Sequence, residues 1–207
     1  FNNFKKKKYL FISHIIKKNF NFDNDFYFKD CKNYLCNENV EFEFLYLNHT
    51  KKNFLEKIIL NNNIDFFIKF KNFLKIIIEA FKILILNKFS ISNFKIRLKV
   101  FCHTLSAETF INLNIGDKFK KIIKKNKPEK IFLTFEGFAY EKIIFNNANL
   151  MGIKTIGYQH SFINPKTSLF IDKITFNPKK ILTSGELTKK LFINKFKIEN
   201  KYLKNFG

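Results

Sequence analysis

The sequence predicts an α/β fold, a parallel β-sheet with flanking helices. Short apolar runs of strand length alternate with helical stretches of about 10–15 residues, most clearly in the second half of the chain. The chain has 207 residues and is 46% hydrophobic, so it can bury a sizeable core. It has no Gly-, Ser- or Pro-rich linker and no evident internal repeat, so its composition marks no internal boundary.

The first half of the chain contains segments of both kinds. Thr50 is placed to cap one helix, and another expected helix begins with acidic residues, which suit a helix N-terminus. Strands are expected at Lys8–Ile16, Val40–Leu47 and Lys95–His103, and helices at Asp23–Asn39, Lys51–Asn61 and Ile64–Lys88.

The helical stretch at Ile64–Lys88 is amphipathic. Lys75, Glu79 and Lys82 interrupt its most apolar part at intervals of three or four residues, which places them on one face of a helix. We expect the apolar face to pack on the core, and the alternative is a helix lying on a membrane surface.

The second half gives clearer signals. The segment Asn114–Pro128 has Asp117 near its start, lysines in its last turns and a proline as its stop, which predicts a helix. Further helices are expected at Ala139–Gly152 and Glu186–Phe196, and strands at Lys130–Glu136, Lys154–His160, Lys179–Gly185 and from Lys201 onward.

The net charge of +21 favours anionic partners, but the kind of basic residue argues against nucleic acid. Arg97 is the only arginine, whereas proteins that read bases use the arginine fork. We therefore expect a solvated lysine surface with no nucleic-acid partner. A weak attraction to anionic membrane lipid is the more plausible consequence of the charge.

Metal and nucleotide-binding motifs are missing from the sequence. Cys31, Cys36 and Cys102 form no CxxC pair, and the four histidines show no HxxxH or HxH spacing, so we expect no metal site. Reduced thiols of this kind are typical of a cytosolic protein. The chain also lacks GxGxxG, GxxxxGK[ST] and GxSxG.

Polar residues gather where the strands of the second half are expected to end. In parallel sheets, ligands bind beyond the carboxyl ends of the strands, so these residues are candidates for a site. Wet strand ends are also polar in sheets without a site, which is the alternative explanation. The residues are Glu136, Gly137, Gln159, His160, Ser161, Ser184 and Gly185.

Two glutamates and a histidine offer acid–base chemistry. Glu136 follows a strand directly, where a partly enclosed carboxylate can act as a general base. Glu141 falls in the first turn of a helix, so it either takes part in catalysis or complements the helix dipole. His160 can contact a phosphate or a sugar hydroxyl, or simply bond to the loop backbone.

Two glycines and a serine at strand ends suggest binding roles. Gly137 permits a sharp turn or a close approach to a ligand. Ser184 and Gly185 precede a helix N-terminus, which attracts anions, although Ser184 or Thr183 can equally cap that helix.

The segments Pro128–Ile163 and Pro178–Phe192 resemble bacterial surface-carbohydrate (O-antigen or capsule) biosynthesis proteins of the GT-B glycosyltransferase type. The shared pattern is an E-x-x-x-x-E element after a strand, then a helix, a strand closing on G-x-x-H-S, and a strand ending in a small residue and glycine. The resemblance extends over about Ser106–Gly207 and is weak before it. Tyr140 stands where many relatives have tryptophan.

The resemblance implies two Rossmann-like domains that face each other across a cleft, of which this chain is the N-terminal part. Residues 1–185 would form the acceptor-side domain, and residues 186–207 a connecting helix and the start of a donor domain. The implied catalytic residues are Glu136, Glu141 and His160, and the implied substrate-binding residues are Gly137, Gly157, Gln159, Ser161, Ser184 and Gly185.

The resemblance also implies an activity and a location. A metal-independent, cytoplasmic enzyme would transfer a sugar from a nucleotide-sugar donor to a glycan or lipid-linked acceptor, without a cofactor and with a peripheral contact to the anionic inner membrane. The chain begins at Phe1 and ends at Gly207 after an apolar run, so we expect a fragment that is inactive alone. The alternatives are a non-catalytic carbohydrate-binding protein on the same fold and, less favoured, a basic nucleic-acid-binding protein.

Overall fold

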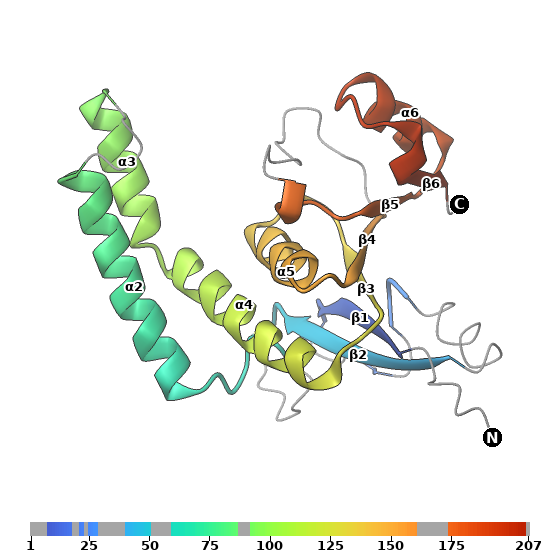
Figure 1. Cartoon of the computed structure of the whole chain (residues 1–207), viewed down its shortest axis with the longest axis horizontal. Helices are drawn as coiled ribbons and strands as arrows, with labels where there is room; N and C mark the ends of the chain where they lie inside the picture. The colour runs from blue at the N-terminus through green and yellow to red at the C-terminus, as the bar shows by residue number, and fades with distance from the viewer. Residues whose placement is uncertain are drawn as a thin grey trace.

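The computed structural model contains a six-stranded, all-parallel sheet with five α-helices among its described residues, a Rossmann-like α/β fold (Figure 1). The described residues are 8–17, 21–22, 25–28, 40–50, 59–86, 92–160 and 174–205. The strands are β1 (Lys8–Ile15), β2 (Glu41–Asn48), β3 (Lys130–Thr134), β4 (Lys154–Gln159), β5 (Lys180–Thr183) and β6 (Leu203–Asn205).

The strand order β2-β1-β3-β4-β5-β6 places a reversal beside β1. The chain moves from β1 to β2 on one side and later to β3 on the other side. In the register of the sheet, Ile12 of β1 lies between Leu45 of β2 and Leu133 of β3. Because all strands are parallel, their carboxyl ends lie along one edge, and ligands bind at that edge where the strand order reverses.

The two faces of the sheet bury different kinds of side chain. On one face, aliphatic residues such as Leu10 and Ile12 join residues from three helices in the main core. These helices are α4 (Ala107–Asn126), α5 (Ala139–Leu150) and α6 (Glu186–Asn194). On the other face, Phe11 stacks between Phe44 and Phe132, with ring centroids 5.1 and 4.6 Å away. Burial of both faces explains why the strands are continuous apolar runs rather than strictly alternating ones.

The described helices are α2 (Phe66–Leu84), α3 (Phe94–Thr104), α4 (Ala107–Asn126), α5 (Ala139–Leu150) and α6 (Glu186–Asn194), with 3₁₀ turns at Ile174–Phe176 and Asn200–Tyr202. α2 and α3 lie side by side and extend away from the sheet (Figure 1). A buried hydrogen bond from Nδ2 of Asn72 to Oδ1 of Asn114, 3.0 Å long, ties α2 to α4.

The strand expected at Lys95–His103 is wrong, because these residues form α3. The side chain of Asn93 accepts hydrogen bonds from the backbone N–H groups of Lys95 and Ile96 and so caps the helix. None of the α3 residues is buried, unlike the residues of a strand inside a covered sheet. The charged and apolar side chains instead lie on an exposed helix beside α2.

The helix expected at Asn114–Pro128 begins earlier, at Ala107, where the hydroxyl of Ser106 accepts from the N–H of Thr109. Gly116 lies inside this helix rather than near its start. A side chain at Gly116 would collide with Ile143, so the glycine lets α4 lie close against α5.

Several expected elements lie partly or wholly outside the described residues. Most of the helices predicted at Asp23–Asn39 and Lys51–Asn61 fall there. At the other end of the chain, β6 pairs with β5 in the same sheet, with Ile181 beside Leu203. The described part of residues 186–207 therefore extends this sheet, and a donor domain after it stays a prediction.

Candidate functional site

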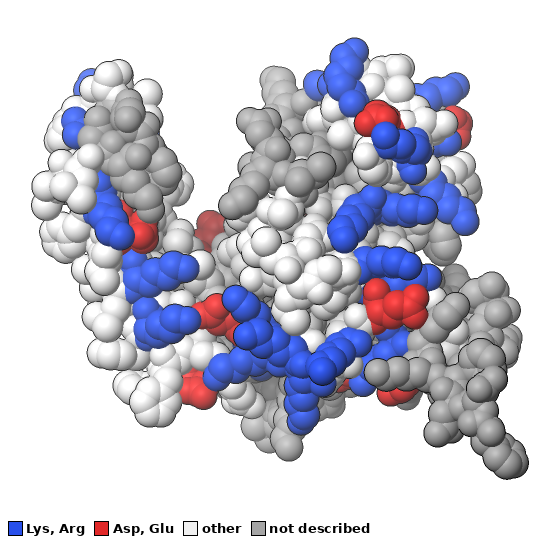
Figure 2. Space-filling view, in the orientation of Figure 1, with Lys and Arg blue, Asp and Glu red and all other residues white. Residues whose placement is uncertain are grey.

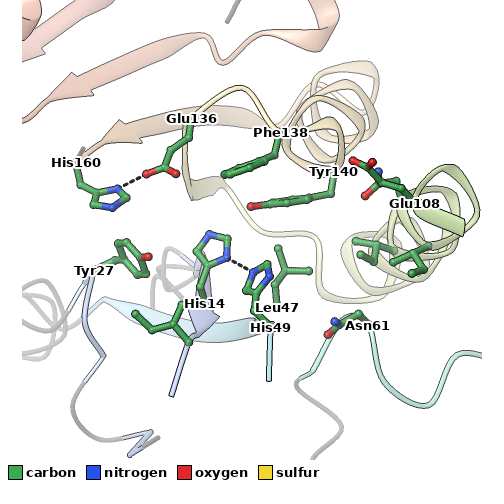
Figure 3. A pocket seen from close by; sticks show the side chains of 14 residues that line it. His14, Tyr27, Leu47, His49, Asn61, Glu108, Glu136, Phe138, Tyr140 and His160 are labelled. Atoms are coloured by element: carbon green, nitrogen blue, oxygen red, sulfur yellow. Dashed lines mark hydrogen bonds and ion pairs between the residues drawn. The ribbon is translucent and has the colours of Figure 1, made fainter. Parts of the chain in front are cut away.

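A pocket of about 450 Å³ opens at the carboxyl edge of the sheet, beside the reversal of strand order (Figure 3). Its walls come from the ends of β1, β2 and β4, from the β3–α5 connection and from the N-terminal half of α4. The lining residues are His14, Ile16, Tyr27, Leu47, His49, Asn61, Glu108, Ile111, Asn112, Ile115, Glu136, Phe138, Tyr140 and His160.

Glu136 and His160, which were both expected at strand ends, lie next to each other at this pocket. Oε1 of Glu136 lies 3.0 Å from Nδ1 of His160, and about a quarter of each side chain is exposed (Figure 3). The ring of Tyr27 packs edge-on against His160 at 4.5 Å. Burial lowers the pKa of His160, and the charge of Glu136 partly offsets this effect.

Glu141 lies behind the pocket wall, where its carboxylate holds the turn that presents Glu136. Its Oε2 accepts hydrogen bonds from the backbone N–H groups of Glu136, Gly137 and Phe138, at 2.9, 2.8 and 3.0 Å. These groups precede or begin α5 and have no partner within the helix, so the carboxylate satisfies them in place of water. Gly137 has φ of 95°, a conformation that favours glycine.

The protonation of Glu141 is strongly perturbed. Burial raises its pKa to about 8, and the charge of Glu136 adds to this effect, while the three backbone N–H groups oppose it. Glu141 is fully buried and does not line the pocket. Its contacts are those of a positioning residue, and its catalytic role stays a prediction.

Two histidines from the first half of the chain complete the site. His14, at the end of β1, is buried, and its Nδ1 lies 2.8 Å from Nε2 of His49, which follows β2. Nε2 of His14 lies 2.6 Å from Oγ1 of Thr134, the last residue of β3. Burial lowers the pKa of His14 to about 3, and the nearby His49 and His160 add smaller effects in the same direction. Burial also lowers the pKa of His49, so both imidazoles are neutral at neutral pH.

Sequence reasoning missed His14 and His49, because they lie 35 residues apart and form no local motif. Only the strand-end criterion could have found them. His14 lies next to the last residue of β1, and His49 directly follows β2, so both histidines lie at the carboxyl ends of strands.

Aromatic rings form much of the remaining wall. Phe138 is half exposed and stacks on Tyr140, with centroids 5.4 Å apart and planes 12° apart. Burial raises the pKa of Tyr140, and the charges of Glu141 and Glu136 raise it further, so its hydroxyl stays neutral. Among the lining residues that the structure describes, the acids are Glu108 and Glu136, and none is Lys or Arg. The pocket therefore suits a neutral ligand with hydroxyl groups better than an anion.

The other expected site residues that the structure describes are not among the residues that line this pocket. Gly157 serves packing, because a Cβ atom there would lie 2.9 Å from Cβ of Phe135 and from Cγ of Pro178. Gln159 is buried, while Ser184 and Gly185 lie at the end of β5, two strands away from β3. Ser161 lies outside the described residues. The substrate-binding roles of these residues stay predictions.

Within the described ranges, no three His, Cys, Asp or Glu side chains form a cluster that could hold a metal ion. No protein-family model and no curated protein sequence matches this chain at a significant level. The likeness to GT-B glycosyltransferases therefore rests on the sequence motifs alone.

Proposed function

We propose that this chain is the acceptor-binding domain of a glycosyltransferase of surface-polysaccharide biosynthesis, the N-terminal half of a GT-B enzyme. The pocket carries the proposal. It combines aromatic rings, which can stack on a sugar ring, with a carboxylate that can accept a hydroxyl proton. Its position at the reversal of strand order is where such sheets bind ligands.

In the proposed reaction, Glu136 accepts the proton of the acceptor hydroxyl. The hydroxyl oxygen forms a bond to the anomeric carbon of the donor sugar, and the bond from that carbon to the leaving phosphate breaks. The nucleotide departs with the electron pair. The contact with His160 and the turn held by Glu141 fix the position of the Glu136 carboxylate, which is what a general base requires.

The donor phosphates would bind outside this pocket, since none of its described lining residues is Lys or Arg. A second domain that faces the carboxyl edge, as the resemblance implies, would supply the nucleotide-sugar site. Ser184 and Gly185, at the same edge before α6, are the residues of this chain that we assign to that side.

A lipid-linked acceptor would bring the protein to an anionic membrane, and the α2–α3 hairpin is suited to that contact. Its large apolar side chains point to solvent, with Phe66, Phe67 and Phe70 exposed by 72, 78 and 53%. Figure 2 shows basic side chains on this part of the surface. Lys71 and Lys75 line the same shallow hollow of α2 as Phe67 and Phe70. In the part of the chain that the structure describes, no helix has the length and apolar character to cross a bilayer.

A non-catalytic carbohydrate-binding protein is the second candidate, because the same pocket would serve it. The two candidate functions differ in whether a sugar is turned over. An enzyme containing this chain would transfer or hydrolyse the sugar of a nucleotide sugar, whereas a binding protein would give saturable glycan binding alone.

A binding experiment with the whole chain tests the pocket assignment. We expect neutral mono- and oligosaccharides to shift the NMR signals of His14, His49 and His160, and free UDP, GDP and CMP to leave them unchanged. Nucleotides that shift these signals more strongly than every glycan tested would contradict an acceptor site. Tyr27→Ala is expected to weaken glycan binding, with the exposed Tyr202→Ala as its control.

A further inference from the structure

A continuous row of polar contacts leads from the pocket to the buried Glu141. Nε2 of His49 lies 2.8 Å from Nδ1 of His14, and Nε2 of His14 lies 2.6 Å from Oγ1 of Thr134. That hydroxyl lies 3.3 Å from Oε1 of Glu141. His49 lines the pocket and Glu141 does not, so the row joins a solvent-accessible imidazole to an enclosed carboxyl group.

The chemistry of the four groups makes the row directional. A neutral imidazole carries one N–H, so His14 donates from one nitrogen and accepts at the other. If His14 donates from Nε2 to Thr134, the hydroxyl donates to an ionised Glu141, and His49 donates from Nε2 to His14. If Glu141 is protonated, it donates to Thr134, the hydroxyl donates to Nε2 of His14, and Nδ1 of His14 donates to His49.

We propose that His49, His14 and Thr134 form a proton relay that connects the pocket to Glu141. A proton that arrives at Nδ1 of His49 releases the proton on its Nε2 to Nδ1 of His14. His14 then passes its Nε2 proton to Thr134, and Thr134 passes its hydroxyl proton to Glu141. The row gains one proton, both histidines end neutral, and each has moved its N–H from Nε2 to Nδ1.

The surroundings of the row favour this exchange. Burial keeps both histidines neutral by lowering each pKa, and it raises the pKa of Glu141 to about 8. Glu141 is therefore the group in the row that changes charge in mildly alkaline solution. The titratable groups that face the row are His160 and Glu136 from the strand ends, Tyr27, whose ring lies 5.4 Å from that of His14, and Tyr140 and Lys142 of α5.

In the proposed reaction, the relay gives the pocket a second proton acceptor. The relay itself does not depend on the proposed function, whereas its part in the reaction does. A hydroxyl bound near His49 could release its proton through the relay to Glu141, in addition to the proton that Glu136 accepts. Glu141 would then have two tasks: it fixes the turn through its Oε2 and stores a proton through its Oε1.

Imidazole ¹⁵N NMR on the whole chain tests the relay without any transfer assay. We expect His14 and His49 to exchange tautomers together, with one shared midpoint, as the pH crosses the pKa of Glu141. The N–H should be on Nδ1 below the midpoint and on Nε2 above it. Tautomers that stay unchanged, or that change at separate midpoints, would overturn the proposal.

Three variants sharpen this test. Thr134→Ser keeps the hydroxyl and should retain the shared midpoint, whereas Thr134→Val should abolish it. Glu141→Gln presents an amide N–H₂ to Thr134 and should hold both histidines in the Nδ1–H form at every pH. A shared tautomer change that survives in Thr134→Val would also overturn the relay. If Thr134→Val does not fold, the wild-type titration and Thr134→Ser still decide the question.

Discussion

Nδ1 of His160 and Oε1 of Glu136 lie 3.0 Å apart, although the two residues follow different strands of the sheet. Glu136 follows β3 and His160 follows β4, and the parallel pairing of these strands brings their ends together. The contact holds the Glu136 carboxylate at the pocket.

In the proposed glycosyltransferase, Glu136→Gln should lower sugar transfer by about 10²–10⁴-fold, because the amide cannot accept the acceptor proton. Glycan binding and the melting temperature should change little, since Glu136 is partly exposed. The matched control is Glu108→Gln, which removes the other acid of the pocket. Transfer rates that are equal in the two variants would remove Glu136 from the role of base.

Gly137→Ala should destabilise the fold by about 1–2 kcal/mol, because the residue has φ of 95°. It should also impair glycan binding or transfer, since the strained turn presents Glu136. Gly152→Ala is the control, because Gly152 has φ of 74° but lies at the far end of α5. Thermal unfolding should show similar losses for both variants. An equal loss of function in both would mean that the turn has no special role in the site.

Acid should destabilise the protein through His14. In the unfolded chain this imidazole takes a proton below its ordinary pKa of 6.5, whereas in the folded protein it does so only near pH 3. The unfolded state therefore binds more protons between these values, and the free energy of unfolding falls as the pH falls from 6.5 toward 3, by on the order of a few kcal/mol.

Chemical denaturation at several pH values measures this dependence against a His14→Gln variant. The comparison is needed because Glu141 has the opposite effect. Its contribution lowers the free energy of unfolding as the pH rises from 4.5 to about 8. His14→Gln should flatten the acid limb, and the control His103→Gln, at an exposed position, should not. Acid limbs of the same slope in wild type and His14→Gln would contradict the prediction.

The α2–α3 hairpin should bind vesicles that contain phosphatidylglycerol and not vesicles of phosphatidylcholine alone. A triple change of Phe66, Phe67 and Phe70 to serine should reduce this binding about tenfold or more, because these exposed rings would insert into the lipid. Leu187→Ser, at a position of α6 that is 85% exposed, is the control. Co-sedimentation measures both. Binding that the triple change leaves intact would direct the membrane contact elsewhere.

Sequence patterns predicted the second half of the fold well, because strong local signals exist there. Pro128 follows the end of α4 closely, although Asp117 lies in the middle of that helix rather than at its start. The strand predicted at Lys130–Glu136 is β3 with two residues fewer at its end. The segment at Lys95–His103 was misread, because a strand pattern carries no information about whether a sheet is there to receive it. Only the tertiary structure shows that these residues pack beside α2.

The site was predicted in part for a related reason. Glu136 and His160 were accessible to sequence reasoning, because each directly follows a short apolar strand. The pairing of His14 with His49 depends on which strands are neighbours, and neither residue type nor spacing reveals that. Glu141 was assigned both a helix-end and a catalytic role from the sequence, and the geometry supports the first through its three backbone contacts.

The alternation of side chains along β1 limits how this strand can change in length. Leu10 and Ile12 face the helices, while Tyr9 and Phe11 face the aromatic cluster on the opposite side. Deleting a single residue before His14 would leave a run that is still apolar and long enough for a strand, yet every side chain on one side of the deletion would change faces. Deleting two residues would restore the faces but shorten the strand. Gaps in this segment should therefore be tolerated, if at all, in pairs.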